Sequence, residues 1–316
     1  MNNASIRVGV VGVGYLGRYH ARIYSEMPGV ELVGVSDIDP RVADMIAQRY
    51  QCDAYDSPDA LMDRVDAVSV VVPTSEHEQV ALPYLENGVH MLLEKPVAPT
   101  VEAATNIVNC ADQAGVVFQV GHLERFNAGI IALVEQVKEP RFIEAHRLGT
   151  FVERATDVDV VTDLMIHDID IVLSLVQSEI THIAAVGLPV ITDHVDIANA
   201  RLEFANGAVA NVTASRVSTK KFRRIRVFGR KSYHALNFVD QQIELVRTGE
   251  RKVGEKFPET ISKQITVEPR QPLDAELEAF IDTVRTGGQP LVTGHDGLEA
   301  LKVALKVQEK IHACQN

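Results

Sequence analysis

The sequence predicts an α/β protein: an N-terminal doubly wound parallel Rossmann sheet, then an α/β domain with a large, mostly antiparallel open sheet. Up to about residue 120, short apolar runs alternate with helical patterns, and a glycine cluster follows the first run. After Gly121 the apolar segments alternate and are joined by turns such as Asn206-Gly207. At roughly 150 residues per domain, 316 residues suit two domains. We place them at 1–121 and 122–316.

Five buried strands are expected in the first domain. The first begins at Ile6, and the others cover residues 31–36, 65–72, 89–93 and 116–120. Helical patterns separate them, and Asp39-Pro40 opens one of these helices. Since open α/β sheets bind ligands beyond the carboxyl ends of their strands, we expect the active site at that edge.

The second domain is expected to be mainly antiparallel. The predicted strands cover residues 197–204, 208–214, 225–228 and 261–267, and the predicted helices cover residues 162–175, 273–285 and 296–310. The C-terminal helical segment, 273–316, is expected to pack back on the Rossmann domain. An antiparallel sheet with one face free of helices favours a homodimer or homotetramer.

Composition argues against several classes of protein. The net charge of −12 disfavours nucleic-acid binding, and no apolar run reaches the ~20 residues of a membrane span. Cys52, Cys110 and Cys314 lie far apart without a CxxC pair. That spacing suggests neither a disulfide framework nor a structural zinc site, and it fits a reducing cytoplasm.

The glycine cluster Gly12-Val-Gly14-Tyr15-Leu16-Gly17 has the GxGxxG pattern of a dinucleotide-binding loop. The first glycine would permit a tight turn, the second a close approach of backbone N–H groups to a pyrophosphate, and the third close packing of helix on strand. Tyr15 and Leu16 are expected at the cofactor with them. The alternative is an ordinary glycine-rich turn.

An acidic residue, Asp37, ends the second expected strand twenty residues after Gly17. Its carboxylate would accept hydrogen bonds from a ribose diol and repel a 2′-phosphate, which favours NAD over NADP. Arg41, the nearest arginine, keeps NADP open as the lesser alternative.

Three segments together resemble the Gfo/Idh/MocA oxidoreductases. They are Val72-Pro-Thr-Ser-Glu-His77, Gly88-Val-His-Met-Leu-Leu-Glu94-Lys95-Pro96 and Asp163-Leu-Met-Ile-His167-Asp-Ile-Asp170. The resemblance covers nearly the whole chain. It implies a Rossmann domain plus an open-sheet domain, with hydride transfer between a nicotinamide and a carbinol carbon of a sugar or polyol.

The resemblance also implies roles for single residues. Lys95 matches the family's catalytic lysine, which would stabilise the developing alkoxide. His167 matches its base and Asp163 the partner of that base; an imidazole can accept a hydroxyl proton at neutral pH. Each has a simpler alternative: a turn lysine, a packed core histidine and a surface ion-pair residue.

Further residues are expected at the cofactor on the same resemblance. They follow the third and fourth long strands: Pro73, Thr74, His77 and Glu94, together with Lys95. For His77, a packed and hydrogen-bonded core position is an equal alternative. Asp168 and Asp170 could suggest a metal, but the family needs none and no third ligand is evident, so we predict no catalytic metal.

Three other stretches resemble the UDP-N-acetylglucosamine 3-dehydrogenase branch of this family: 121–127, 157–167 and 214–218. That branch supplies a 3-keto sugar to an aminotransferase in making amide-linked lipid A. The resemblance implies a UDP-sugar substrate, with His122, Glu124 and Arg125 near it. One departure is Ala128 where the branch usually has proline.

A cationic segment supports an anionic substrate. Residues 204–239 contain eight Lys or Arg and no Asp or Glu. Arg216 or Arg224 could pair with a diphosphate through its guanidinium fork. Alternation along a strand puts Arg224 and Arg226 on one face and Arg223 on the other. The alternative is a solvated strand edge whose charges prevent aggregation.

Two other functions remain open on the sequence. The first is another sugar or inositol dehydrogenase of the same fold, for which the cationic segment would be irrelevant. The second is a dinucleotide-binding regulator without catalysis. Retention of Lys95, Asp163 and His167 argues against a regulator, which has no need of them.

Overall fold

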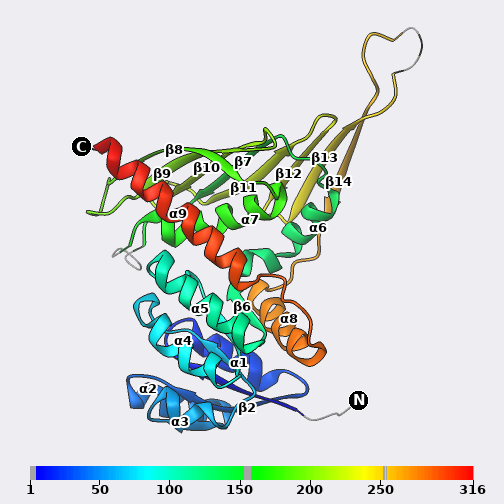
Figure 1. Cartoon of the computed structure of the whole chain (residues 1–316). Coiled ribbons are helices and arrows are strands. Elements are labelled where there is room, and N and C mark those ends of the chain that lie inside the picture. Colours follow the sequence, from blue (N-terminus) through cyan, green and yellow to red (C-terminus); the bar gives the residue numbers. More distant parts are fainter. Residues whose placement is uncertain (1–4, 153–157, 252, 254, 316) are drawn as a thin grey trace. The chain divides into compact units, whose positions relative to one another are not determined.

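In a computed structural model, the structure describes residues 5–152, 158–251, 253 and 255–315 (Figure 1). The chain divides into two compact units. Unit 1 consists of Met1–Phe126 and Gln271–Leu301, and unit 2 of Asn127–Arg270 and Lys302–Asn316. The predicted fold class is confirmed, and each unit is built around one sheet.

Unit 1 contains a six-stranded sheet of order β3-β2-β1-β4-β5-β6, in which every pair is parallel. Its strands are β1 (Ile6–Val11), β2 (Val30–Ser36), β3 (Asp53–Tyr55), β4 (Ala67–Val70), β5 (His90–Glu94) and β6 (Phe118–Gly121). The short β3 was not predicted, because its three residues carry no apolar run. The order of strands reverses between β1 and β4, and such a switch point is where doubly wound sheets bind ligands.

The helices of unit 1 flank this sheet. They are α1 (Gly17–Glu26), α2 (Pro40–Tyr50), α3 (Pro58–Met62), α4 (His77–Glu86), α5 (Val101–Ala114) and α8 (Pro272–Thr286), with the 3₁₀ turns η1 (Thr74–Glu76) and η2 (Leu123–Phe126). Helix α8 is integral to the unit, because Leu277, Phe280 and Ile281 share one buried core with Val8 and Tyr24.

Unit 2 contains an eight-stranded sheet of order β14-β13-β12-β11-β7-β10-β9-β8. Its strands are β7 (Phe142–Leu148), β8 (Ile180–Leu188), β9 (Ile197–Phe204), β10 (Val209–Ser215), β11 (Phe222–Phe228), β12 (Ser232–Asn237), β13 (Gln242–Thr248) and β14 (Thr260–Thr266). All pairs are antiparallel except β7 with β10. Four strands were not predicted: β7, β8, β12 and β13, whose charged and polar residues interrupt the apolar pattern.

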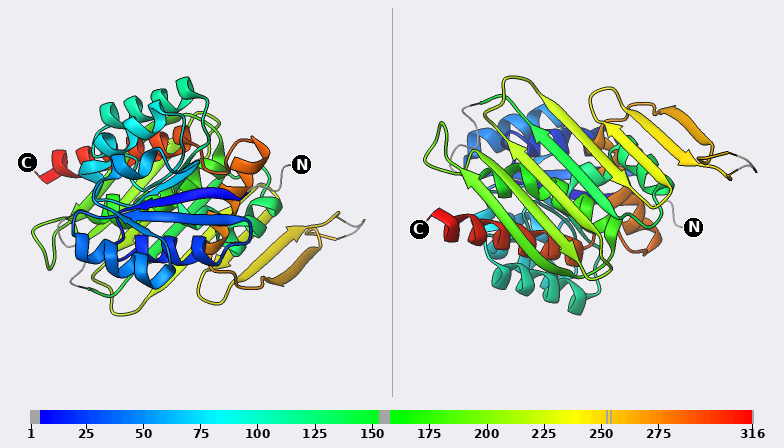
Figure 2. Two further views of the ribbon diagram at one scale, coloured as in Figure 1. Left: turned by 90° about the horizontal axis from the view of Figure 1, so that it is seen from below. Right: turned by 90° about the horizontal axis from the view of Figure 1, so that it is seen from above.

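Helices cover one face of this second sheet. They include α6 (Ala128–Gln136) and α7 (Ile166–Val176), the latter preceded by the π-helical turn η3 (Val161–Met165). The opposite face is in view in the right panel of Figure 2, and no helix of the described part of unit 2 covers it. The long C-terminal helix α9 (Gly294–Gln315) begins in unit 1 and ends in unit 2.

Two structural findings concern membrane spans and disulfides, which the sequence does not predict. Within the described residues, no helix is both long and apolar enough to cross a membrane. Cys52 and Cys110 are free thiols, and the side chain of Cys314 lies outside the described part of the chain.

Candidate active site

The glycine loop joins β1 to α1 at the strand switch point of unit 1. Gly12 has a φ of +85°, and a Cβ there would lie 2.7 Å from the Val71 carbonyl oxygen. A Cβ on Gly17 would lie 1.8 Å from the Gly12 oxygen, so the helix can start only with glycine. Above Gly14, in contrast, the space is open to at least 4 Å. The loop therefore leaves room for a ligand at its middle glycine.

Helix α1 begins in a way that suits an anion. Leu16 is its N-cap and makes no side-chain hydrogen bond to the helix, and the first turn contains no acidic residue. Helices α2, α3 and α5 are capped instead by the side chains of Asp39, Ser57 and Thr100. The N–H groups at the start of α1 can thus serve an anionic ligand. Tyr15, beside them, is 59% exposed.

Asp37 links the end of β2 to the glycine loop. Its carboxylate accepts hydrogen bonds from the Val13 N–H (2.8 Å) and the Asp39 N–H (3.0 Å), and the side chain remains half-buried. Arg41, the arginine that kept NADP open, instead makes a two-pronged ion pair with Asp39 at 3.1 and 2.9 Å. Asp37 therefore faces the loop without a cation between them.

Lys95 follows β5, at the carboxyl edge of the sheet. Its backbone N–H donates to Oε2 of Glu94 (3.3 Å), and Glu94 itself is buried. The Lys95–Pro96 peptide bond is cis. The half-buried Lys95 side chain lies near His122, whose pKa falls to about 3 through burial and through the charges of Lys95 and Arg125. His122 is therefore neutral and cannot compete with Lys95 for an anionic oxygen.

His77 connects two loops at the same edge. It is 1% exposed, and its ring nitrogens contact the Val97 carbonyl at 3.1 Å and the Val72 carbonyl at 3.0 Å. Burial lowers its pKa, so the ring is neutral at pH 7. The side chain thus links the loop that begins at Val72 to the loop after Lys95.

The three residues predicted near the substrate after β6 also lie in unit 1. His122 and Glu124 are buried, and Arg125 donates to the Leu291 carbonyl at 3.4 Å. Of the three, Arg125 is the most exposed.

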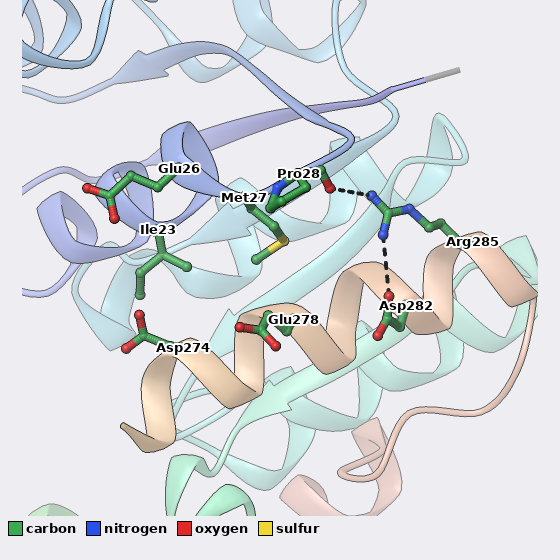
Figure 3. Close-up of a pocket in the computed structure, with 8 residues that line it drawn as sticks. All are labelled: Ile23, Glu26, Met27, Pro28, Asp274, Glu278, Asp282 and Arg285. Atoms are coloured by element: carbon green, nitrogen blue, oxygen red, sulfur yellow. Dashed lines mark hydrogen bonds and ion pairs between the residues drawn. The ribbon is translucent and has the colours of Figure 1, made fainter. Parts of the chain in front are cut away.

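A hollow of 490 Å³ on unit 1 lies between α1 and α8 (Figure 3). Carboxylates dominate its lining, and its arginine, Arg285, already donates to the Pro28 carbonyl (3.0 Å) and to Asp282 (3.3 Å). None of the predicted site residues lies in it, and its carboxylates would repel a phosphate. We therefore do not assign it to the cofactor.

In unit 2, Asp163 and His167 lie on consecutive helical turns of different geometry. Asp163 belongs to the π-helical turn η3, and His167 lies in the first turn of α7, 8% exposed. The spacing of four residues in the sequence therefore does not produce a regular α-helical pair, since π turns shift side chains around the axis. Residues 153–157, which precede this segment, lie outside the described residues.

Asp163 lines a hollow of 580 Å³ on unit 2. Asn127, Phe238 and Val239 contribute to its wall, and its cations are Arg147, Arg216, Lys221 and Arg223. Lys221 and Arg223 are exposed, whereas Arg147 and Arg216 are buried. The hollow thus combines one carboxylate, several cations and an apolar wall.

The two buried arginines of this hollow are held by carboxylates. Arg147 makes a bidentate pair with Asp168 at 2.7 and 3.1 Å. Arg216 donates to Asp196 at 2.8 Å and to the Thr192 hydroxyl at 3.2 Å. Asp168 is thereby explained without a metal, and the described residues contain no group of three His, Cys, Asp or Glu that could hold one.

Arg224, predicted as a phosphate ligand, has side-chain partners on neighbouring strands. Its guanidinium lies 3.0 Å from Glu244 and 3.3 Å from the Tyr233 hydroxyl, and it is not part of the hollow. Strand alternation turns Arg223 to the hollow instead, opposite Arg147 on β7. The sequence missed Arg147, Lys221 and Arg223, although the cationic segment signalled the last two.

Known proteins match both units. Residues 6–122 match the family described as "Oxidoreductase family, NAD-binding Rossmann fold", and residues 132–233 match the "GFO/IDH/MocA C-terminal domain". A UDP-N-acetylglucosamine 3-dehydrogenase from Acidithiobacillus ferrooxidans is 36% identical over 309 residues, 98% of each chain. The chain belongs to the Gfo/Idh/MocA oxidoreductase family.

Solved structures of this family agree. The A. ferrooxidans UDP-N-acetylglucosamine 3-dehydrogenase has a TM-score of 0.92, covering 98% of each chain. A Lactobacillus casei scyllo-inositol dehydrogenase with bound NAD(H) and scyllo-inositol, 21% identical, shares the fold with a TM-score of 0.82, covering 98% of this chain and 97% of that one.

As a Gfo/Idh/MocA oxidoreductase, the protein is an enzyme that uses NAD. The residues of unit 1 fit this cofactor: the space above Gly14 suits the pyrophosphate, and Asp37 suits a ribose diol. The predictions of family, enzyme class and cofactor are confirmed.

Proposed function

We propose that the protein oxidises the 3-hydroxyl of UDP-N-acetylglucosamine with NAD. The observation that carries the proposal is the 36% identity to a UDP-N-acetylglucosamine 3-dehydrogenase over 98% of both chains. The cationic hollow of unit 2 supports it, because a neutral cyclitol has no use for exposed Lys221 and Arg223.

In the proposed mechanism, the alcohol loses a hydride from its carbon and a proton from its oxygen, leaving a ketone. Bound NAD supplies the hydride acceptor. The Lys95 ammonium hydrogen-bonds the reacting oxygen and stabilises the negative charge that develops there. His167 takes the hydroxyl proton, and Asp163 orients the groups around that oxygen.

Substrate recognition in this proposal falls to the hollow of unit 2. Lys221 and Arg223 neutralise the diphosphate, for which the guanidinium fork of Arg223 is well shaped. Phe238 and Val239 supply an apolar wall for the less polar parts of the nucleotide sugar. Arg216 also contributes to the lining of the hollow, and we keep it as a proposed contact of the diphosphate. Its guanidinium pairs with Asp196 as well.

The test mixes the purified protein with NAD and UDP-N-acetylglucosamine and follows reduced nicotinamide by absorbance. Hydroxylamine, which traps the ketone as an oxime, draws an unfavourable equilibrium forward, and mass spectrometry identifies the adduct. Parallel reactions contain N-acetylglucosamine, myo-inositol or scyllo-inositol. Turnover of an inositol and not of the UDP-sugar would identify the protein as a cyclitol dehydrogenase. Binding of NAD without turnover of any of them would favour a regulator.

The remaining predictions concern the protein's partners, its location in the cell and its oligomeric state. We infer that a 3-keto product passes to an aminotransferase, as in lipid A synthesis, and that the reaction takes place in the cytoplasm. We also infer a homodimer or homotetramer, because the outer face of the unit 2 sheet carries Phe142, Phe222 and Phe228 among its side chains. Light scattering of the purified protein tests the assembly, and a monomer would contradict it.

A further inference from the structure

Unit 1 contains a buried cluster of polar side chains beneath the Lys95 turn. His20 comes from α1, Glu94 from β5, Gln119 from β6 and Glu276 from α8, and none is more than 6% exposed. The sequence predictions assigned Glu94 to the cofactor and gave no role to Glu276. Two carboxyl groups and one imidazole therefore share the interior of the Rossmann unit.

Glu94 is the centre of this cluster. Its Oε2 accepts the Lys95 backbone N–H at 3.3 Å, and its Oε1 lies 3.3 Å from Nε2 of His20. Gly121 makes room for it, since a Cβ there would lie 2.9 Å from Oε2. Its carboxylate is also close enough to His77 to affect the charge of that ring. Any displacement of Glu94 would therefore move the backbone that carries Lys95.

Glu276 adds a second carboxyl group to this buried cluster, and its side chain is unsatisfied. The residue is 0% exposed, and neither side-chain oxygen has a hydrogen-bond partner, although its backbone carbonyl accepts from Gln119 at 3.2 Å. Oε1 of Glu94 also lacks a partner of good hydrogen-bond geometry. An ionised carboxylate could not stay there without donors, whereas a protonated acid has one O–H to donate.

The charges around this pair decide which form is present. Burial raises the pKa of Glu276 well above 4.5, and the charge of Glu94 raises it further. The other titratable groups packed around the pair are His20 and Tyr24 of α1 and His77 of α4. Burial raises the pKa of Tyr24 and lowers the pKa of His77, so both stay neutral. Two neighbouring buried carboxyl groups cannot both ionise cheaply, so one proton remains in the cluster.

We propose that Glu276 is a positioning residue: as a neutral acid it donates its O–H to Glu94, and Glu94 then holds the turn that carries Lys95. The proposal rests on the proposed role of Lys95. The protonation state of Glu276 does not depend on that role, and it can be measured without any substrate.

Three variants test the proposal. Glu276→Gln keeps the shape and an N–H donor, Glu276→Leu removes the donor, and Glu278→Gln is the matched control. Glu278 lies two residues away on the same helix, exposed and facing the hollow of Figure 3. Infrared difference spectra of wild type minus Glu276→Gln at pH 8 should contain the C=O stretch of a carboxylic acid. Its absence would overturn the proposal.

Unfolding gives a second readout that does not need activity. A group whose folded pKa is raised weakens the fold as pH rises from 4.5 toward that raised pKa, because only the unfolded chain releases the proton. Glu276→Gln should therefore raise the thermal midpoint at pH 8 by roughly 2–4 °C and have a smaller effect at pH 5. A lower midpoint at pH 8 would mean that Glu276 is ionised and paired, contrary to the proposal.

Kinetics test the positioning itself. Glu276→Leu should lower kcat about 10–100-fold with little change in the KM for NAD, since a displacement near 1 Å can have that effect. Glu276→Gln should restore most of kcat. Wild-type kcat in the Leu variant, or equal loss in both variants, would overturn the positioning role. If no substrate is turned over by the wild type, the proposed function fails, while the infrared and unfolding results still decide the state of Glu276.

Discussion

The two units differ in the groups that they offer to the phosphates of the cofactor and of the proposed substrate. The first 120 residues carry a net charge of −9, and the anion site there is made of backbone: an open glycine and an uncapped helix start. The hollow of unit 2 is lined by cationic side chains instead. Two of them, Arg147 and Arg216, are buried and pair with carboxylates, whereas Lys221 and Arg223 are exposed. The two units therefore differ in whether backbone N–H groups or cationic side chains line the site.

The largest expected effect concerns a buried pair of unit 2. Asp196 is 0% exposed and accepts the Val190, Ile191 and Thr192 N–H groups as well as Arg216. Asp196→Ala should reduce the free energy of unfolding by about 3–5 kcal/mol, because the buried Arg216 loses the carboxylate with which it pairs. Urea unfolding measures it. The exposed Arg201–Glu203 pair is the control, and Glu203→Gln should change stability by less than about 0.5 kcal/mol.

The same pair predicts a pH dependence. Burial opposes ionisation of Asp196, but its backbone hydrogen bonds and Arg216 outweigh burial, and its pKa lies far below the usual range. A depressed pKa stabilises the fold above the unfolded value and loses that contribution as pH falls below about 4. Wild type should therefore lose stability between pH 4 and pH 2 more steeply than Asp196→Asn. Parallel curves for the two proteins would contradict this account.

The next prediction concerns the proposed catalytic role of a unit 1 residue. Lys95→Ala should lower kcat by about 10²–10³-fold, because the charge that stabilises the developing alkoxide is removed. Binding of NAD, followed by protein fluorescence, should change little, since the glycine loop and Asp37 are intact. Lys306→Ala, at an exposed pair with Glu309, is the control. Wild-type turnover in Lys95→Ala would disprove the mechanism.

A smaller effect tests the backbone site. Asp37→Ala should narrow the preference for NAD over NADP by about tenfold. A tenfold change corresponds to about 1.4 kcal/mol, the size of one charge-assisted hydrogen bond. The ratio of kcat/KM for the two cofactors measures this. Arg41→Ala should leave that ratio unchanged, because Asp39 already pairs with Arg41. A wild type that prefers NADP would contradict the assignment of Asp37.

The smallest effect tests the side-chain site. Lys221→Ala and Arg223→Ala should each raise the KM for UDP-N-acetylglucosamine up to about fivefold, as expected of exposed charges, with kcat unchanged. Arg226→Gln is the matched control on the same strand, since Arg226 pairs with Glu144 on the opposite face. An equal rise of KM in all three variants would mean that only the net charge of the sheet matters.

Much of unit 1 could be predicted because its signals are local. A buried parallel strand is a short apolar run, and Gly17 is required by the oxygen of Gly12, only five residues before it. Asp39 and Thr100 likewise cap the helices that follow them. In unit 2, β13 was missed because Glu244 and Arg247 interrupt its apolar pattern, although Ile243 and Leu245 are buried.

The sequence by itself determined the fold class, the family, the cofactor loop and the presence of a cationic strand, all of which depend on residue type and short spacing. Only the tertiary structure decided which cations face the hollow. Pairing across the sheet gave Arg224 to Glu244 and turned Arg223 the other way. It also brought Glu276, 182 positions after Glu94, into the same buried cluster. Charge and burial act through space, so partners far apart in the chain leave no local pattern to read.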